Sequence, residues 1–312
     1  MKNTRIILIS IILFGAIYLN FLLPEVDENK ITISNHQNEF NKYFKSFSLV
    51  TPDSIIFANE LAPINSNDIW ERYDKEIHKN VYWQSNTIFY LKRANKYFPI
   101  IEPILKKNNI PNDFKYLAVI ESGLENLVSP AGASGYWQFM KGTAIDYGLE
   151  VNSEIDERYH LEKSTQAACE YLQKAYDRFG SWTMAAAAYN MGKGGLERKV
   201  KQQGSKNYYN LYLNMETSRY IFRLLAIKEI FENKEKYGFN LREQDLYSFP
   251  ETRLININEE DINLFELANN LQINYKILKI FNPWLRDTEI TNKNNKTYII
   301  KIPTEKDINI FE

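Results

Sequence analysis

Apolar residues recur with helical spacing after Pro111. Positions i, i+3, i+4 and i+7 of this pattern are held by Phe114, Leu117, Ala118 and Glu121. Asp113 is placed to cap the start of this helix, and Gly123 is a residue type that ends helices. We therefore expect Glu121 to lie in the last turn of an otherwise apolar helix.

The same spacing predicts further helices along the middle of the chain. One runs over 165–179 after Ser164 as its cap, one over 182–190 after Ser181, and one over about 216–232. Residues 70–108 are also helical in pattern, with two prolines at 99 and 103 that interrupt a helix or begin the next one. No alternating strand pattern occurs between 66 and 236, so this region is expected to be all-helical.

The pattern changes after residue 250. RLININ and TYIIKIP are typical of strands, and the segments LFELANNL and YKILKIF between them are typical of short helices. We expect a separate module over 250–305 with the order β-α-α-β. The whole chain is thus expected to be mainly α, with an all-helical domain over 70–240 and this small βααβ module.

The N-terminus resembles an export segment. Lys2 and Arg5 precede an apolar run over 6–23, and acidic residues follow it. The run is at the short end for a spanning helix and longer than most signal-peptide cores, so 1–23 is a signal anchor or a cleaved signal peptide. Either reading places the rest of the protein outside the cytoplasm. Residues 24–69 are polar and are expected to form a weakly structured spacer.

Composition narrows the candidate chemistry. The net charge of −1 gives no basic field for nucleic acid. His36, His78, His160 and Cys169 are too few and too scattered for a metal site, so no metal or cofactor is expected, and Cys169 is expected to be a small buried side chain. The 21 Tyr, 18 Phe and 5 Trp belong either to the core or to a groove that binds sugar rings.

Glu121 is the candidate acid. Cleavage of a glycosidic bond needs a protonated group, and an ordinary glutamate, with a pKa of about 4.3, is ionised at neutral pH. Apolar surroundings raise the pKa of a carboxyl because they disfavour its charged form. The nearby apolar candidates are Leu117, Ile120, Leu124, Trp137, Phe139 and Met140. A loop of small residues over 129–135 lets backbone approach a ligand closely, although such a loop is also common as a simple turn.

Three motifs in order give the chain a resemblance to a known family. Glu121-Ser122 and SPAGASGYWQFMKGTA (129–144) are followed by AYNMG (188–192) and ETSRY (216–220). Together they resemble the soluble lytic transglycosylases, bacterial enzymes of goose-lysozyme-like fold that cleave peptidoglycan. The segment between them is similar to the membrane-bound branch with C-terminal LysM modules. Lys141, Met191 and Asn214 depart from the family pattern, which affects details of glycan binding rather than the acid.

The resemblance implies a role for each matching residue. Glu121 matches the catalytic acid and base, and Ser122 and Ser129 match hydroxyls near it, Ser129 facing the sugar at the scissile bond. The glycan-contacting pair corresponds to Gln138 and Met140. The opposite side of the groove corresponds to Tyr189 and Asn190, with Tyr189 hydrogen-bonding near the catalytic carboxyl. Glu216 matches a buried acid with a structural or substrate-contacting role.

The lack of a second suitable carboxyl beside Glu121 changes the reaction that we expect. Glycosidases ordinarily use two carboxyls, and none of Glu125, Asp146, Glu150 and Glu154 has the apolar context of Glu121. An acid suffices alone if the C6 hydroxyl of the substrate's own MurNAc attacks C1, because intramolecular attack has a large effective molarity. The expected product is then 1,6-anhydroMurNAc. The alternatives are a hydrolase like goose-type lysozyme and a non-catalytic peptidoglycan-binding protein.

Residues 253–303 resemble a LysM module that has lost its usual G-D-T, with Asn258-Glu259-Glu260-Asp261 in its place. LysM modules bind glycans that contain N-acetylglucosamine, so this module either binds glycan or only packs against the domain. The resemblance implies peptidoglycan strands as the main partner and the periplasmic face of the envelope as the location. Membrane contact through 1–23 is expected, and other wall-remodelling enzymes are candidate partners.

Overall fold

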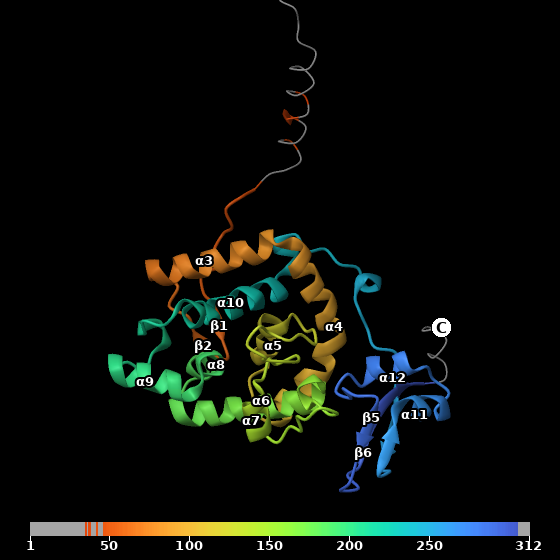
Figure 1. Cartoon of the computed structure of the whole chain (residues 1–312). Helices are drawn as coiled ribbons and strands as arrows, with labels where there is room; N and C mark the ends of the chain where they lie inside the picture. Colours follow the sequence, from red (N-terminus) through yellow and green to blue (C-terminus); the bar gives the residue numbers. More distant parts are fainter. Residues whose placement is uncertain (1–34, 36, 39–41, 43–45, 305–312) are drawn as a thin grey trace, which may run out of the picture. The chain divides into compact units, whose positions relative to one another are not determined.

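The computed structural model describes residues 35, 37, 38, 42 and 46–304 (Figure 1). The expected export segment, 1–23, lies outside the described residues, as does most of the expected spacer before residue 46. Within the described part, none of the helices combines the length and the apolar character that crossing a bilayer requires. Residues 49–304 belong to one compact unit.

The described residues between 66 and 236 form helices joined by turns and isolated bridges, with no strand among them. We call this part, together with residues 49–65, the helical domain. Its α-helices are α3 (Asn67–Tyr82), α4 (Gln84–Lys107), α5 (Lys115–Ser122), α6 (Lys141–Asp146), α7 (Leu161–Phe179), α8 (Trp182–Met191), α9 (Lys193–Gln203) and α10 (Met215–Glu232). Single 3-10 turns are η1 (Asn112–Phe114), η2 (Glu157–Tyr159), η3 (Tyr208–Asn210), η4 (Lys234–Tyr237) and η5 (Glu243–Asp245). The expected all-helical domain is confirmed.

Helix α5 is short and lies inside this domain (Figure 1). Its eight residues are too few to form a stable helix alone, so packing against α4 and α10 must hold it. Six of the eight are buried: Tyr116, Leu117, Ala118, Val119, Ile120 and Ser122. The expected N-cap, Asp113, lies one residue too early, in η1. Its carboxylate instead accepts the N–H of Ala58 at 2.7 Å and binds Lys228 Nζ at 2.6 Å.

The last part of the expected spacer belongs to the helical domain. Residues 56–61 form a small hairpin of β1 (Ile56–Phe57) and β2 (Glu60–Leu61), and Phe57 is fully buried against the ring of Phe114 at 5.2 Å. Glu60 lies at the N-terminus of α8, where its carboxylate accepts the N–H groups of Trp182 at 2.6 Å and Thr183 at 2.9 Å. This differs from the expected weak structure, because single buried residues in a polar segment give no periodic signal.

Helix boundaries follow the sequence signals in part. Ser181 caps α8 as expected, with its hydroxyl accepting the N–H of Met184. Ser164 was expected to begin α7 but lies inside it, because α7 starts at Leu161 and the Ser164 hydroxyl donates to the carbonyl of His160 at 2.8 Å. Pro99 and Pro103 lie within α4, which continues through both, so the expected interruption there is wrong.

The C-terminal module, residues 252–303, has the expected β-α-α-β order with one addition. Its elements are β3 (Thr252–Ile257), β4 (Asp261–Asn263), α11 (Leu264–Asn270), α12 (Tyr275–Phe281), β5 (Glu289–Thr291) and β6 (Tyr298–Pro303). β3 pairs antiparallel with β6, and the short pair β4–β5 was not expected. Ile155 and Tyr159 of the helical domain are buried in the core of this module, so the two parts share packing.

Loss of the Glu60 carboxylate should destabilise the protein. Glu60→Ala is expected to lower the free energy of unfolding by about 1–2 kcal/mol, because two N–H groups at the start of α8 lose their acceptor. Urea unfolding measures this, with the exposed helical residue Glu71→Ala as a control that should change little. Equal losses in the two variants would show that Glu60 does not hold the hairpin to α8.

Candidate active site

Glu121 lies in the last turn of α5, as the sequence predicts. The helix ends at Gly123, which has a left-handed φ of 63°. A Cβ at this position would lie 2.6 Å from Cε1 of Tyr90, so a side chain there would force the Tyr90 ring to move as well as strain the backbone. The unpaired carbonyls at a helix C-terminus carry partial negative charge, which disfavours an ionised carboxylate there.

Burial raises the pKa of Glu121 to about 7. A hydrogen bond from Tyr220 and the charge of Arg223 lower this pKa, and the charge of Glu216 raises it, but burial is the largest effect. The guanidinium of Arg223 is held by the carbonyl of Ile120 at 2.6 Å. At neutral pH the Glu121 carboxyl is therefore protonated in a large fraction of molecules, as a proton donor requires.

Tyr220 is the hydrogen-bond donor to the Glu121 carboxyl. Its hydroxyl, on α10, donates to Oε1 of Glu121, and the residue is almost completely buried. The resemblance placed Tyr189 near the carboxyl, and the Tyr189 hydroxyl donates to the carbonyl of Trp137 at 2.8 Å. The helical spacing over 216–232 gives Tyr220 no role at this site. Its place as the last residue of the ETSRY motif was the signal that could have identified it.

The loop after α5 is held by its own hydrogen bonds. Ser129 closes a turn in which its N–H donates to the carbonyl of Ala133 at 2.8 Å and its hydroxyl accepts the N–H of Ala133 at 3.0 Å. The Gln138 amide donates to the carbonyls of Leu127 at 3.0 Å and Gly135 at 2.8 Å. Gln138 has a φ of 50°, so these bonds hold a backbone conformation that is uncommon for a residue with a side chain.

Ser122 and Met140 differ in what they can contact. Ser122 is buried, and its hydroxyl lies 2.8 Å from the carbonyl oxygen of Tyr136. It therefore ties α5 to the loop rather than facing a ligand. Met140 is 47% exposed at the start of α6, which leaves an apolar side chain on the surface.

Arg158 connects this loop to the rest of the domain. Its guanidinium is buried and pairs through two bonds with Asp156, at 2.9 Å and 2.7 Å. Its Nη1 donates to the carbonyls of Gly132 at 3.0 Å and Phe139 at 3.2 Å. A Cβ on Gly135 would collide with the Arg158 carbonyl oxygen, so the loop packs directly on this residue. No pattern in the sequence singled out Arg158.

Asn190 and Glu216 lie together on the other side of the site. The Asn190 amide donates to Glu216 at 2.9 Å and accepts the hydroxyl of Thr217 at 2.8 Å. Asn214 caps α10 by accepting the N–H of Thr217 at 2.8 Å. Glu216 is exposed, which corrects the expectation of a buried acid at this position.

Most of the other candidate acids have partners elsewhere. Glu125 pairs with Arg93, while Glu150 and Glu154 bond to Tyr298 and Thr291 of the C-terminal module. Among the described residues, Glu216 is the carboxylate that acts on the pKa of Glu121. No group of three or more His, Cys, Asp or Glu side chains in the described part of the chain is placed to hold a metal ion.

Comparison with known proteins matches this region to a family description. Residues 98–212 match the family described as "Transglycosylase SLT domain", and the match includes Glu121, the loop and α8. The chain contains an SLT domain. Residues 253–306 match the "Soluble lytic transglycosylase C-terminal LysM-like domain". Both matches agree with the sequence motifs, which resemble a lytic transglycosylase domain followed by a LysM module.

Two curated proteins are similar in sequence to most of this chain. The chain is 28% identical over 259 residues to "Membrane-bound lytic murein transglycosylase D" of Escherichia coli, and the protein of a second strain gives the same values. The alignment covers 78% of this chain and 56% of each relative, so the chain spans about half the length of the curated relatives it matches. The crystal structure of the 70 kDa soluble lytic transglycosylase of Escherichia coli aligns with 19% identity and a TM-score of 0.41, over 56% of this chain and 33% of that one.

Replacement of Glu121 should reveal the cost of its burial. The raised pKa means that folding stability falls as the pH rises from about 4.5 towards 7, because the unfolded chain releases the proton first. Glu121→Gln is therefore expected to be more stable than the wild type by up to about 3 kcal/mol above pH 7, with little difference near pH 4. Urea unfolding at the two pH values, with Glu71→Gln as the exposed control, tests this. A pH-independent difference would contradict the raised pKa.

Proposed function

We propose that this protein is a peptidoglycan lytic transglycosylase that cleaves the β-1,4 bond between MurNAc and GlcNAc and leaves 1,6-anhydroMurNAc ends. The observation that carries the proposal is the Glu121 carboxyl inside the SLT domain, with a pKa of about 7 at the end of a buried helix. The curated relatives are named lytic murein transglycosylases, which agrees with this chemistry.

Glu121 acts first as an acid. In its protonated form it donates its proton to the glycosidic oxygen, and the bond from that oxygen to C1 of MurNAc breaks. The hydrogen bond from Tyr220 and the charge of Arg223 favour the carboxylate that this step produces. The raised pKa therefore favours proton donation by Glu121, whereas Tyr220 and Arg223 favour the carboxylate that then acts as the base.

Glu121 then acts as a base. Its carboxylate takes the proton of the MurNAc C6 hydroxyl while that oxygen forms a bond to C1, so the proton lost in the first step is recovered and no water is consumed. The substrate supplies the nucleophile, which removes the need for a second carboxylate. The remaining nearby acid, Glu216, is exposed and bonded to Asn190, a position suited to substrate contact or to supporting Asn190.

The loop residues bind the glycan in this proposal. Ser129 accepts a backbone N–H through its hydroxyl, which leaves the hydroxyl proton to donate to a sugar oxygen. The Gln138 amide nitrogen is used within the loop, so its amide oxygen is the atom that faces the glycan. Met140 offers an exposed apolar contact to a sugar ring, and Tyr189 and Asn190 border the opposite side.

The location follows from the substrate. Peptidoglycan lies outside the cytoplasmic membrane, and the relatives are named membrane-bound. We place the protein in the periplasm, attached through residues 1–23 or released after their cleavage. The C-terminal module is proposed to bind peptidoglycan strands, and other wall-remodelling enzymes are candidate partners at the same surface.

Glu121→Gln should abolish glycan cleavage. We expect at least a ~100-fold loss of soluble product from purified peptidoglycan, because a neutral amide cannot donate the proton. Glu125→Gln is the control, since Glu125 is paired with Arg93, and it should stay within about tenfold of the wild type.

Mass spectrometry of the wild-type products separates the two reactions on this fold. Anhydro ends are lighter than hydrolytic ends by one water. Hydrolytic ends would favour a goose-type lysozyme-like hydrolase. Glu121→Gln activity within about tenfold of the wild type would remove Glu121 from the reaction.

Tyr220→Phe should move the pH profile to higher pH. Its hydroxyl lowers the pKa of Glu121, so removing it keeps the acid protonated further into the alkaline range. We expect the alkaline limb of the kcat/KM profile to shift upward by about half a unit or more, with lower activity at its maximum. Tyr208→Phe removes a buried hydroxyl that bonds to carbonyls of α10 and serves as the control. An unchanged or lowered alkaline limb in Tyr220→Phe would contradict the assignment.

A further inference from the structure

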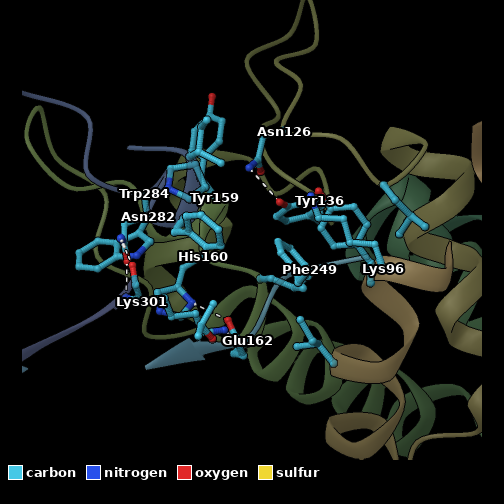
Figure 2. Close-up of a pocket in the computed structure, with 18 of the residues that line it drawn as sticks. Lys96, Asn126, Tyr136, Tyr159, His160, Glu162, Phe249, Asn282, Trp284 and Lys301 are labelled. Atoms are coloured by element: carbon cyan, nitrogen blue, oxygen red, sulfur yellow. Dashed lines mark hydrogen bonds and ion pairs between the residues drawn. The ribbon is translucent and has the colours of Figure 1, made fainter. Parts of the chain in front are cut away.

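A cavity of about 480 Å³ lies between the helical domain and the C-terminal module (Figure 2). On one side it is lined by α4, by residues 124–126 and by Tyr136, and on the other by α12 and β6. Residues 159–162 form part of the wall, and Glu121 is not among the lining residues. The cavity is thus separate from the site described above, and its volume is in the range that holds small organic ligands.

Aromatic rings form much of the wall. The ring of Tyr97 lies 5.1 Å from that of Tyr136 and 5.4 Å from that of Phe249, measured between centroids. The ring of His160 lies 5.5 Å from that of Trp284 (Figure 2). Such rings offer flat apolar faces with polar edges, which suit a ligand that is part apolar and part polar, such as a sugar ring.

The charged side chains of the lining carry a positive excess. The cations are Arg93, Lys96, Lys279 and Lys301, and the acids are Glu125 and Glu162. Arg93 pairs with Glu125, and Lys301 pairs with Glu162. Four cations against two acids leave a net charge of +2, so the cavity favours an anionic ligand.

Lys96 is the lining cation whose charge is best placed for such a ligand. Its Nζ lies 4.1 Å from the ring centroid of Phe249 and 5.5 Å from that of Tyr97, and no described residue forms an ion pair with it. Lys279 differs, because its Nζ donates to the carbonyls of Leu285 and Asp287. Burial lowers the pKa of Lys96, which a bound anion would reverse.

We propose that this cavity binds a carboxylate-bearing muramyl fragment of peptidoglycan, with its carboxylate at Lys96 and its apolar face against the half-buried ring of Phe249. The substrate class rests on the proposed function, and the cavity is a second site away from Glu121. Two carboxylates of peptidoglycan fit this chemistry: the lactyl carboxylate of free MurNAc, and a carboxylate of the stem peptide attached to it.

The cavity borders the segment that follows Glu121. Arg93 donates to the carbonyl of Gly123 at 3.2 Å, and Leu124, Glu125 and Asn126 line the wall. Asn126 also donates to the hydroxyl of Tyr136 at 3.1 Å (Figure 2). A ligand in the cavity therefore contacts residues three to five positions after Glu121, which places fragment binding next to the end of α5.

Calorimetric titration of the Glu121→Gln protein tests the proposal without turnover. The probes are N-acetylmuramic acid, N-acetylmuramoyl-L-alanyl-D-glutamate and N-acetylglucosamine. We expect one of the two carboxylated probes to bind in a one-to-one ratio, and at least tenfold more tightly than N-acetylglucosamine. The tighter of the two identifies the lactyl or the peptide carboxylate as the group that is bound. Binding should persist when a chitin oligosaccharide, which carries no carboxylate, fills the groove at Glu121.

Variants then place the ligand. Lys96→Met keeps the apolar stem of the side chain and should weaken the carboxylated probe at least tenfold, while exposed Lys106→Met should leave it unchanged. Lys96→Gln serves if the first variant does not fold. Three results would each overturn the proposal. The Lys96 variants could bind the carboxylated probe as tightly as the parent protein, or the parent could bind N-acetylglucosamine as tightly as the carboxylated probe. The chitin oligosaccharide could also displace the carboxylated probe. None of these results depends on which product the active enzyme releases, so the proposed function stands or fails separately.

Discussion

The loop that borders the candidate site depends on one buried guanidinium. Arg158 is fixed by Asp156 and donates to two carbonyls, that of Gly132 within the loop and that of Phe139 shortly before α6. A buried arginine is tolerated only when its charge is paired and its N–H groups have acceptors, and both conditions are met here. Lysine could not replace it, because a single ammonium lacks the planar fork that binds Asp156 and two carbonyls at once.

The C-terminal module is hydrogen-bonded to the segment that contains Asp156 and Arg158. The N–H of Asp156 donates to the carbonyl of Trp284 at 2.9 Å, and the backbone N–H of Arg286 donates to the carbonyl of Glu154 at 2.7 Å. Ile155 is buried in the core of the module. The module is therefore joined to the residues that hold the loop of the candidate site, and the cavity with Lys96 lies along the same junction. The glycan binding proposed for the module and the order of the loop therefore depend on the same contacts.

The sequence predicted the helix that carries Glu121, its end at Gly123 and the mainly helical class, because these depend on local spacing and on one glycine. It also predicted the order of the module, although the β4–β5 pair was missed. The roles of Tyr220, Arg158 and Glu60 were not predicted. Tyr220 bonds to Glu121 and Glu60 bonds to residues 182–183, across long separations in the chain that no local pattern encodes. Glu216 was expected to be buried but is exposed, since a motif gives residue types and not solvent access.

The proposed chemistry depends on Glu121 being a proton donor near neutral pH. The pKa of its carboxyl is raised by burial while Tyr220 and Arg223 act in the opposite direction, so the balance between them decides the chemistry. The most direct measurement is a carbon-13 NMR titration of the Glu121 side-chain carboxyl, assigned by its loss in Glu121→Gln. The structure predicts a midpoint of about 7. A midpoint near about 4.3, the ordinary value for a solvated glutamate, would contradict the assignment of Glu121 as the acid.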